Sequence, residues 1–282
     1  MKRGSREEWF SDWVAGMRFY DAHNHLQDDR FGGRHGELLA ACARVGVRRM
    51  VVNGSCEADW PAVLALAGEH PVVLPSFGYH PWYVGERTTG WLAALEDFLG
   101  RCPAAVGEIG LDRWKPGLSY EGQEEVFVAQ LRLAAERNLP VSIHCLQAWG
   151  RLVDLLRAGP RPARGFLLHS YGGSQELVGP LAELGAYFSF PGYFAHERKV
   201  RQRETFRRVP AERLLVETDA PDQLLPEALT EFPLVEAGAG RALNHPANLG
   251  AVYRFVAELR GEPLAVLTAQ VEANFQRLFG GL

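Results

Sequence analysis

Lysine is scarce in this sequence, and long hydrophobic runs are missing from it. Of the 30 basic residues among 282, only Lys2, Lys115 and Lys199 are lysines. This leaves few candidates for chemistry on a lysine amine, such as a Schiff base or a carboxylated lysine. No apolar run reaches 18 residues, and the charged N-terminal segment lacks the apolar stretch of a signal peptide. We therefore expect neither membrane insertion nor secretion, and we place the protein in the cytoplasm.

Neither positive charge nor cysteine is abundant. The 30 basic residues are outnumbered by 34 acidic ones, which gives a net charge of −4. No global basic field can hold nucleic acid, so any such contact must come from a local patch. The four cysteines are scattered and form no C-x-x-C pair, which argues against a structural zinc site and a disulfide framework and fits reduced thiols.

Apolar segments recur roughly every thirty residues along the chain. Several are nearly continuous in Val, Ile, Leu and Phe, which is typical of parallel strands buried on both faces. Helix-like segments lie between them, and two more close the chain. The eight predicted strands are residues 17–25, 47–54, 72–80, 104–112, 139–146, 165–171, 186–193 and 213–221.

This alternation of strands and helices predicts an α/β fold, and the number eight predicts closure into a (β/α)8 TIM-type barrel. A doubly wound open sheet is the alternative, but the glycine-rich nucleotide turn is absent after the first strand. We expect one barrel domain over residues 17–282, preceded by an N-terminal extension of residues 1–16. Residues 221–248 contain helix breakers and little periodicity, which predicts a long loop.

Histidines and acids gather where the predicted strands end. In a closed barrel these carboxyl ends meet at one face, where reactive groups collect. Alternate residues of a strand share a face, so Asp21, His23 and His25 can point the same way. The strand-end residues are His23, His25, His80, Glu108, His144, His169 and Asp219.

Six of these side chains supply enough nitrogen and oxygen ligands for two divalent cations. Taken alone, a histidine pair would be as well explained by the surface or the core, and Glu108 by a turn. Together they predict a two-metal site whose cations, about 3.5–4 Å apart, share and activate a hydroxide. Carboxylates admit Mg²⁺ or Mn²⁺, whereas imidazoles suit Zn²⁺. The predicted ligands are His23, His25, Glu108, His144, His169 and Asp219, and Asp219 is also placed to accept a proton from the bound water.

The same motifs carry a family resemblance. Asp-Ala-His-Asn-His at 21–25, Gly-Tyr-His-Pro at 78–81, Gly-Glu-Ile-Gly-Leu-Asp at 107–112, His-Ser at 169–170, Glu-Thr-Asp-Ala-Pro at 217–221 and the C-terminal Asn-x-x-x-Leu-Phe-Gly resemble the TatD family of metal-dependent hydrolases. The resemblance runs in order from about residue 19 to residue 280. It implies an amidohydrolase-type barrel with a two-metal site and deoxyribonuclease-like hydrolysis. It also implies that Glu108 bridges the cations and that His80 contacts the substrate.

Further candidates surround this set. Glu217 is expected to partner a metal-binding histidine, while Asp112 either orients a ligand or water or is a plain loop acid. The basic run at 198–208 could reach a phosphate backbone with its first turn, although most such runs are solvated helix faces. Four aromatic residues after strand ends could stack on a base or simply pack between loops: Trp82, Tyr83, Trp114 and Trp149.

The hypothesis that joins these observations is a metal-dependent deoxyribonuclease that cleaves phosphodiester bonds with a metal-bound hydroxide. Asp219 and Glu108 are its candidate catalytic residues, DNA or an oligonucleotide is its substrate, and no obligate protein partner is expected. One alternative keeps the two cations but hydrolyses an amide, ester or lactone. The other is a catalytically silent barrel that only binds nucleic acid.

Overall fold

Eight parallel strands form one sheet in the order in which they occur along the chain. The computed structural model describes residues 16–282, so the predicted N-terminal extension lies, except for its last residue, outside the described part. Each strand falls within a segment that the apolar pattern predicted. The strands are β1 (Phe19–Asn24), β2 (Val47–Asn53), β3 (Val73–Phe77), β4 (Ala105–Asp112), β5 (Val141–Leu146), β6 (Phe166–Leu168), β7 (Ala186–Pro191) and β8 (Leu214–Glu217).

The sheet closes on itself between its first strand and the segment after its last one. The backbone N–H of Asp219 donates to the carbonyl of His23 over 3.0 Å, and the N–H of His25 donates to the carbonyl of Ala220 over 2.8 Å. The buried carboxylate of Asp21 adds bonds from the N–H and the hydroxyl of Thr218, at 2.9 and 2.6 Å. Asp21 thus ties the seam of the barrel. The predicted eight-stranded barrel is confirmed.

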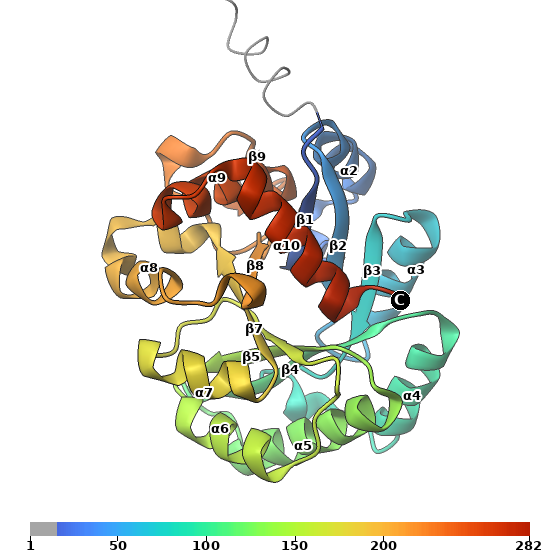
Figure 1. Cartoon of the computed structure of the whole chain (residues 1–282). Coiled ribbons are helices and arrows are strands. Elements are labelled where there is room, and N and C mark those ends of the chain that lie inside the picture. Colours follow the sequence, from blue (N-terminus) through green and yellow to red (C-terminus); the bar gives the residue numbers. More distant parts are fainter. Residues whose placement is uncertain (1–15) are drawn as a thin grey trace, which may run out of the picture.

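Helices surround the strands on the outside of the barrel (Figure 1). They follow the predicted helical segments, with ends that differ by a few residues, and α10 packs against β1 and β8 where the ring closes. The helices are α2 (His35–Arg44), α3 (Trp60–Glu69), α4 (Trp91–Arg101), α5 (Tyr120–Arg137), α6 (Trp149–Ala158), α7 (Val178–Glu183), α8 (Val200–Phe206), α9 (Leu249–Arg260) and α10 (Leu264–Phe279).

Buried polar groups fix the last two helices onto the seam. The hydroxyl of Tyr253 in α9 accepts from the N–H of Tyr20 and donates to its carbonyl, at 3.1 and 2.9 Å. The side-chain amide of Asn274 in α10 donates to the carbonyls of Ala211 and Leu214, at 2.7 and 2.8 Å. These bonds hold the end of the chain against the first and last strands, which fixes the strand ends that carry the site.

The predicted long loop at 221–248 contains a hairpin that the sequence did not predict. Two short antiparallel strands, β9 (Pro233–Val235) and β10 (Ala242–Asn244), pair within it. Three-residue strands leave too short an alternating pattern to be recognised. The buried side chain of Asn248 anchors the segment by accepting from the N–H groups of Glu231 and Phe232. Nowhere in residues 16–282 is a helix long and apolar enough to cross a bilayer.

Candidate metal centre

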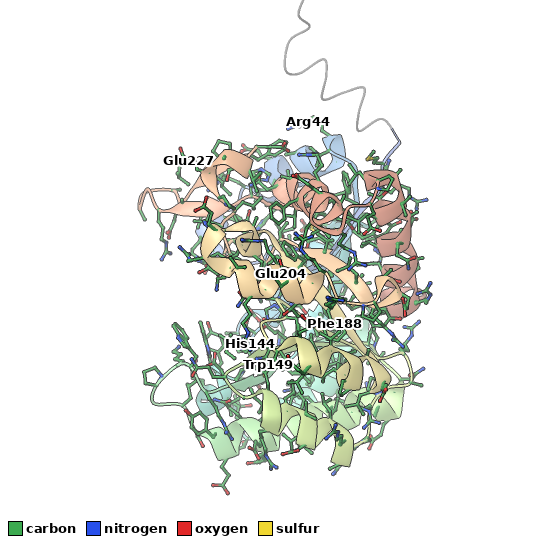
Figure 2. The ribbon with its side chains drawn as sticks, turned by 60° about the vertical axis from the view of Figure 1, so that its left-hand side comes forward. Arg44, His144, Trp149, Phe188, Glu204 and Glu227 are labelled. Carbon is green, nitrogen blue, oxygen red and sulfur yellow. The ribbon has the colours of Figure 1, made fainter. Side chains whose placement is uncertain are left out.

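The strand-end histidines and acids converge at one mouth of the barrel. A cavity of about 640 Å³ opens there, and it is lined by five of the six predicted ligands together with His80. The sixth, His23, is fully buried within reach of the same carboxylate. Figure 2 shows His144 toward the centre of the molecule, with Arg44 and Glu227 at its periphery. Ligands separated by almost 200 residues in the chain therefore lie side by side.

Glu108, at the centre of this cluster, presents its two oxygens to two different groups of ligands. Its Oε2 lies 3.3 Å from Nε2 of His23 and 3.2 Å from Nε2 of His25. Those two nitrogens are 3.3 Å apart, and each lies 3.7 Å from Oδ1 of Asp219. Four donor atoms from β1, β4 and the end of β8 thus face a common point.

The other oxygen of Glu108 faces the histidines of β5 and β6. Its Oε1 lies 2.8 Å from Nε2 of His169 and 3.1 Å from Nδ1 of His144. The two imidazole nitrogens are 3.3 Å apart. The ring of His169 also stacks on that of His23, with centroids 4.0 Å apart, so the two halves of the cluster are in direct contact. A carboxylate placed in this way can bridge two cations.

Hydrogen bonds on the far side of the rings decide which nitrogen of the first two histidines faces the cavity. Nδ1 of His25 lies 2.8 Å from the carbonyl oxygen of Asn53, an acceptor, so this nitrogen carries a proton and Nε2 is the nitrogen left to bind a cation or a second proton. Nδ1 of His23 lies 2.9 Å from the hydroxyl of Ser142 and 3.1 Å from the side-chain amide of Asn53. Both rings are thereby held with Nε2 directed at Glu108.

Asp112 orients His144 in the same way. Its Oδ2 lies 3.0 Å from Nε2 of His144 and accepts from the indole N–H of Trp82 over 2.6 Å. Its Oδ1 accepts from the N–H groups of Trp114 and Lys115, which holds the loop after β4 in place. With Nε2 committed to Asp112, the lone pair of Nδ1 points toward Glu108. This contact with His144 is the one that the orienting interpretation of Asp112 requires.

Glu217, at the end of β8, lies behind His169. It is fully buried, and its Oε1 accepts from the N–H of Ser170 over 2.7 Å and lies 3.8 Å from Nδ1 of His169. Its Oε2 accepts from the hydroxyl of Ser189 in β7. Nδ1 of His169 is itself buried and has no hydrogen bond within the described chain. Glu217 therefore acts on His169 through its charge.

His80 has the opposite arrangement to His25 and His144. Its Nδ1 accepts from the backbone N–H of Trp82 over 3.2 Å, so the proton sits on Nε2. This Nε2 lies 3.5 Å from Oε1 of Glu108 and lines the cavity. His80 consequently presents an N–H donor to the cavity rather than a lone pair. A donor of this kind suits a substrate oxygen better than it suits a cation.

Asp219 has one oxygen for the cluster and one for a neighbour. While Oδ1 faces His23 and His25, Oδ2 accepts from the side-chain amide of Gln223 over 2.6 Å. The same amide lies 2.5 Å from the hydroxyl of Ser170. Both Asp219 and Gln223 have positive φ, at 53° and 50°, so a tight turn after β8 brings the two side chains together.

Glycines on both sides of Glu108 let β4 lie close to its neighbours. A Cβ on Gly107 would come within 2.7 Å of the Cβ of Ser142, and one on Gly110 within 2.0 Å of the carbonyl oxygen of His144. Gly110 also has φ of 150°, a conformation that other residues rarely adopt. Close approach of β4 and β5 brings Glu108 and His144 within reach of one another.

Burial and mutual charge shift the pKa values throughout this cluster. Burial lowers the pKa of His23 to about 4, and the charge of His169 acts in the same direction. Burial also disfavours protonation of His25, but the hydrogen bond and charge of Glu108 prevail and raise its pKa to about 9. Burial works against the ionised form of Glu108, yet the surrounding imidazoles, His169 and His80 foremost, hold its pKa well below the usual range.

Two further shifts complete the charge balance. Burial raises the pKa of Asp219 to about 7, although the charges of His169 and His25 oppose it. Burial likewise opposes protonation of His169, but Glu108 raises the pKa of this imidazole well above its usual value. Without a bound cation, protons on His25 and His169 thus offset the charges of Glu108 and Glu217. Protons and cations compete for the same nitrogen atoms in such a site.

The donor set fits divalent cations. Ligand atoms of three groups lie close enough together to hold an ion: His23 with His25 and Asp219, His23 with Glu108 and His169, and His80 with Glu108 and His144. Imidazole nitrogens and carboxylate oxygens in this proportion are typical of Zn²⁺ and related ions, and also admit Mn²⁺ or Mg²⁺. The third group is weakened as a cation site because Nε2 of His80 carries a proton.

The aromatic candidates divide between the cavity and the core. Trp82, Tyr83 and Trp114 line the cavity, and the side chain of Trp114 is 59% exposed. Trp149 packs edge-on against Tyr171 instead, with ring centroids 4.8 Å apart, so it belongs to the packing between helix and barrel.

Sequence reasoning missed the residues that hold the ligands in place. Asn53 ends the second apolar segment and could have been noticed as a polar residue at a strand end. Gln223 and Ser142 gave no such signal, because one lies in an irregular turn and the other inside a strand.

The chain is similar in sequence and in structure to known proteins. The family described as TatD related DNase matches residues 20–280. Proteins of Escherichia fergusonii and Escherichia coli K12, both named 3'-5' ssDNA/RNA exonuclease TatD, are each 33% identical over 267 residues, which is 93% of this chain and 98% of the relative. The crystal structure of YJJV, a TatD homologue of Escherichia coli K12, is 29% identical with a TM-score of 0.85, and the alignment covers 94% of this chain and 99% of that one.

Proposed function

The chain belongs to the TatD family of metal-dependent hydrolases, and from this premise we propose that it is a two-cation exonuclease that removes nucleotides from single-stranded DNA or RNA. The relatives named above carry the name of a 3'-5' exonuclease acting on single strands, and they align along almost their whole length. We extend that polarity and that substrate to this chain.

One observation supports the proposal most strongly: the two oxygens of Glu108 face separate pairs of imidazole nitrogens. We assign the first cation to His23, His25, Glu108 and Asp219, and the second to Glu108, His144 and His169. Cations bound there would polarise a phosphoryl oxygen and lower the pKa of a bound water.

We assign the proton transfers and the positioning of the ligands to four side chains of the site. Asp219 takes the proton of the attacking water, because its Oδ2 is held by Gln223 while Oδ1 faces the cluster. His80 donates from Nε2 to an oxygen of the scissile phosphate or of the leaving group. Asp112 and Glu217 position His144 and His169 rather than touch the substrate.

The four thiols of the chain are free, and burial raises the pKa of Cys42 and Cys145. Unpaired and protonated thiols suit a reducing compartment, so we propose that the enzyme acts in the cytoplasm.

The direct test is cleavage of a single-stranded oligonucleotide labelled at its 5' end, after chelation and reloading with Mg²⁺, Mn²⁺ or Zn²⁺. A ladder of 5'-labelled products that shortens with time supports the proposal. A panel of amides, esters and lactones is assayed under the same conditions. If one of these compounds is hydrolysed while the oligonucleotides stay uncleaved, the exonuclease proposal is overturned in favour of carbonyl chemistry. Binding of the oligonucleotide without turnover of any substrate would identify a silent nucleic-acid-binding barrel.

A further inference from the structure

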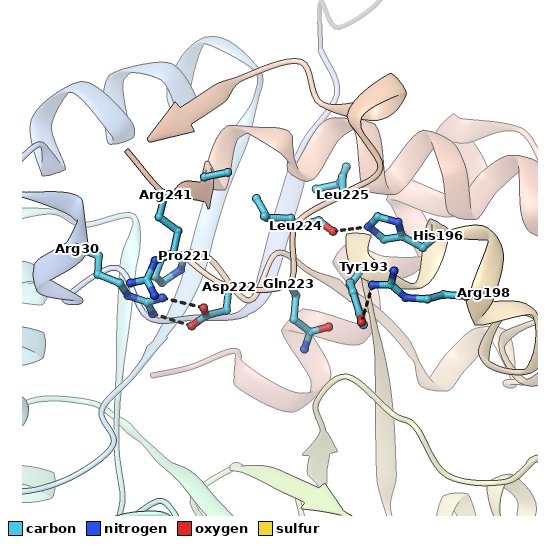
Figure 3. A pocket seen from close by; sticks show the side chains of 11 residues that line it. Arg30, Tyr193, His196, Arg198, Pro221, Asp222, Gln223, Leu224, Leu225 and Arg241 are labelled. Atoms are coloured by element: carbon cyan, nitrogen blue, oxygen red, sulfur yellow. Dashed lines mark hydrogen bonds and ion pairs between the residues drawn. The ribbon is translucent and has the colours of Figure 1, made fainter. Parts of the chain in front are cut away.

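A second hollow lies next to the metal centre, and none of the six candidate cation ligands lines it. Its volume is about 550 Å³, and its wall includes Arg30, Tyr193, His196, Arg198, Gln223 and Arg241. Figure 3 shows Arg30 and Asp222 on one side of it and Tyr193, His196 and Arg198 on the other. The last three follow β7, and Arg198 begins the basic run that leads into α8.

The second hollow adjoins the metal cavity. Arg30, Asp222 and Gln223 line both spaces. Gln223 is also the residue whose amide donates to Oδ2 of Asp219 over 2.6 Å. A chain molecule whose reacting group lies beside Asp219 would therefore pass Gln223 in order to reach the second hollow.

The two spaces differ in charge. Six acidic side chains and one arginine line the metal cavity, whereas three arginines and a single acid, Asp222, line the second hollow. Arg30 is paired with Asp222 and Asp28, and Arg241 with Glu236. Arg198 has no carboxylate partner among residues 16–282, and its guanidinium donates only to the hydroxyl of Tyr193, at 2.9 Å. A cation that is held in place but not neutralised is suited to a phosphate.

Tyr193 provides a flat surface beside that cation. The guanidinium carbon of Arg198 and the ammonium of Lys199 lie 5.2 and 4.5 Å from the centre of its ring. The ring of His196 meets it edge-on at 5.3 Å, and His196 is itself fixed by the carbonyl of Leu224 at 3.1 Å. A half-buried tyrosine framed by cations is the arrangement on which unstacked bases bind in single-strand grooves.

We propose that the second hollow is a nucleotide subsite, which binds the nucleotide adjoining the scissile phosphate by stacking its base on Tyr193 and pairing its phosphate with Arg198. The proposal rests on the proposed function, since it names the part of a single strand that the exonuclease holds while it cleaves. It also explains how a protein of net negative charge contacts a polyanion: the basic patch is local and adjoins the site.

The test compares Arg198→Ala with the matched control Arg201→Ala, which removes an exposed arginine of α8 outside both cavities. Each holoenzyme is assayed on 5'-labelled (dT)8 and on bis(4-nitrophenyl) phosphate, a diester with no adjoining nucleotide. We expect Arg198→Ala to lower kcat/KM on (dT)8 about 10-fold, as for loss of one stacking or phosphate contact. We expect kcat/KM on the small diester to stay unchanged. The slope of log kcat/KM against log salt concentration should become shallower by about 0.7.

Tyr193→Leu provides a second variant. We expect it to lower kcat/KM on (dT)8 and to leave the slope of log kcat/KM against log salt concentration unchanged. Equal rates for Arg198→Ala and Arg201→Ala on (dT)8, or an equal loss on both substrates, would overturn the subsite. Wild-type enzyme that cleaves the small diester but no oligonucleotide would instead refute the proposed function. The two failures are therefore told apart by the wild type alone.

Discussion

At the scale of single residues, the hydrogen bond on the outer nitrogen of each ring determines what a histidine can do. The carbonyl of Asn53 and the carboxylate of Asp112 bind the outer nitrogens of His25 and His144, so the inner nitrogens face Glu108 and are the ones that can bind a cation. His80 accepts a backbone N–H on its outer nitrogen and therefore presents a proton to the cavity. The same residue type thus supplies both ligands and a donor within one site.

Replacing Asp219 with Asn should abolish turnover while the fold is kept. The amide retains the shape of the side chain but cannot take a proton from water, and it is a poorer cation ligand. We expect kcat to fall by at least about 100-fold, as for removal of a general base. Cleavage of single-stranded oligonucleotide and thermal unfolding are measured together, with Asp154→Asn on the exposed face of α6 as the control. Unchanged cleavage by Asp219→Asn would remove Asp219 from the mechanism.

Replacing Asp112 with Asn should weaken one cation more than the other. The change removes the charge that holds His144 and leaves His23 and His25 untouched. Loss of such an outer partner lowers metal affinity about 10- to 100-fold. Calorimetric titration with Zn²⁺ or Mn²⁺ should resolve one unchanged and one weakened binding event. Equal weakening of both events would show that Asp112 acts on the whole site instead of on one ligand.

The sequence predicted the candidate ligands that the structure brings together, but not what holds them. His23, His25, Glu108, His144, His169 and Asp219 could be found because barrel closure brings strand ends together, so position along the chain predicts position in space. Gln223 could not, because its contact with Asp219 depends on a turn with two positive φ angles. The hydrogen bonds that select the nitrogen of each ring arise from tertiary packing, which no local pattern encodes.

At the scale of elements, the approach of β4 to β5 depends on glycine. Gly110→Ala should destabilise the protein strongly, because the new Cβ would lie 2.0 Å from the carbonyl oxygen of His144 and φ is 150°. We expect a loss of at least about 3 kcal/mol in the free energy of unfolding. Gly100→Ala in α4 meets nothing within 4 Å and should stabilise by about 0.5–1 kcal/mol. Denaturant unfolding checks both, and equal stabilities would contradict the close approach.

The strands were easier to predict than the segment after β8. Strands buried on both faces give continuous apolar segments, such as residues 166–168, and these stand out from amphipathic helices. In the hairpin of β9 and β10, four of the six strand residues are exposed or partly exposed. No apolar pattern in the sequence therefore marks it. Its position depends instead on Asn248, whose bonds join residues 16 and 17 positions apart.

At the scale of the whole molecule, cation binding should stabilise a barrel that is already folded. The core extends through all eight strands and their helices, so it does not need the ions in order to form. Saturation at 100 times Kd should add about 2.7 kcal/mol for one site. Thermal unfolding with EDTA and with Zn²⁺ or Mn²⁺ measures this, and Asp219→Asn should show a smaller rise in Tm. An unfolded protein in EDTA, or no rise at all on reloading, would contradict the account.

A two-cation site requires Glu108 to lie between the two cations. Crystals soaked in Mn²⁺ or Zn²⁺ and measured at the absorption edge of the metal give the positions of the cations directly. We predict two anomalous peaks on opposite oxygens of Glu108, one beside His23, His25 and Asp219 and the other beside His144 and His169. A single peak that Glu108 does not contact, or no peak at saturating metal, would contradict it.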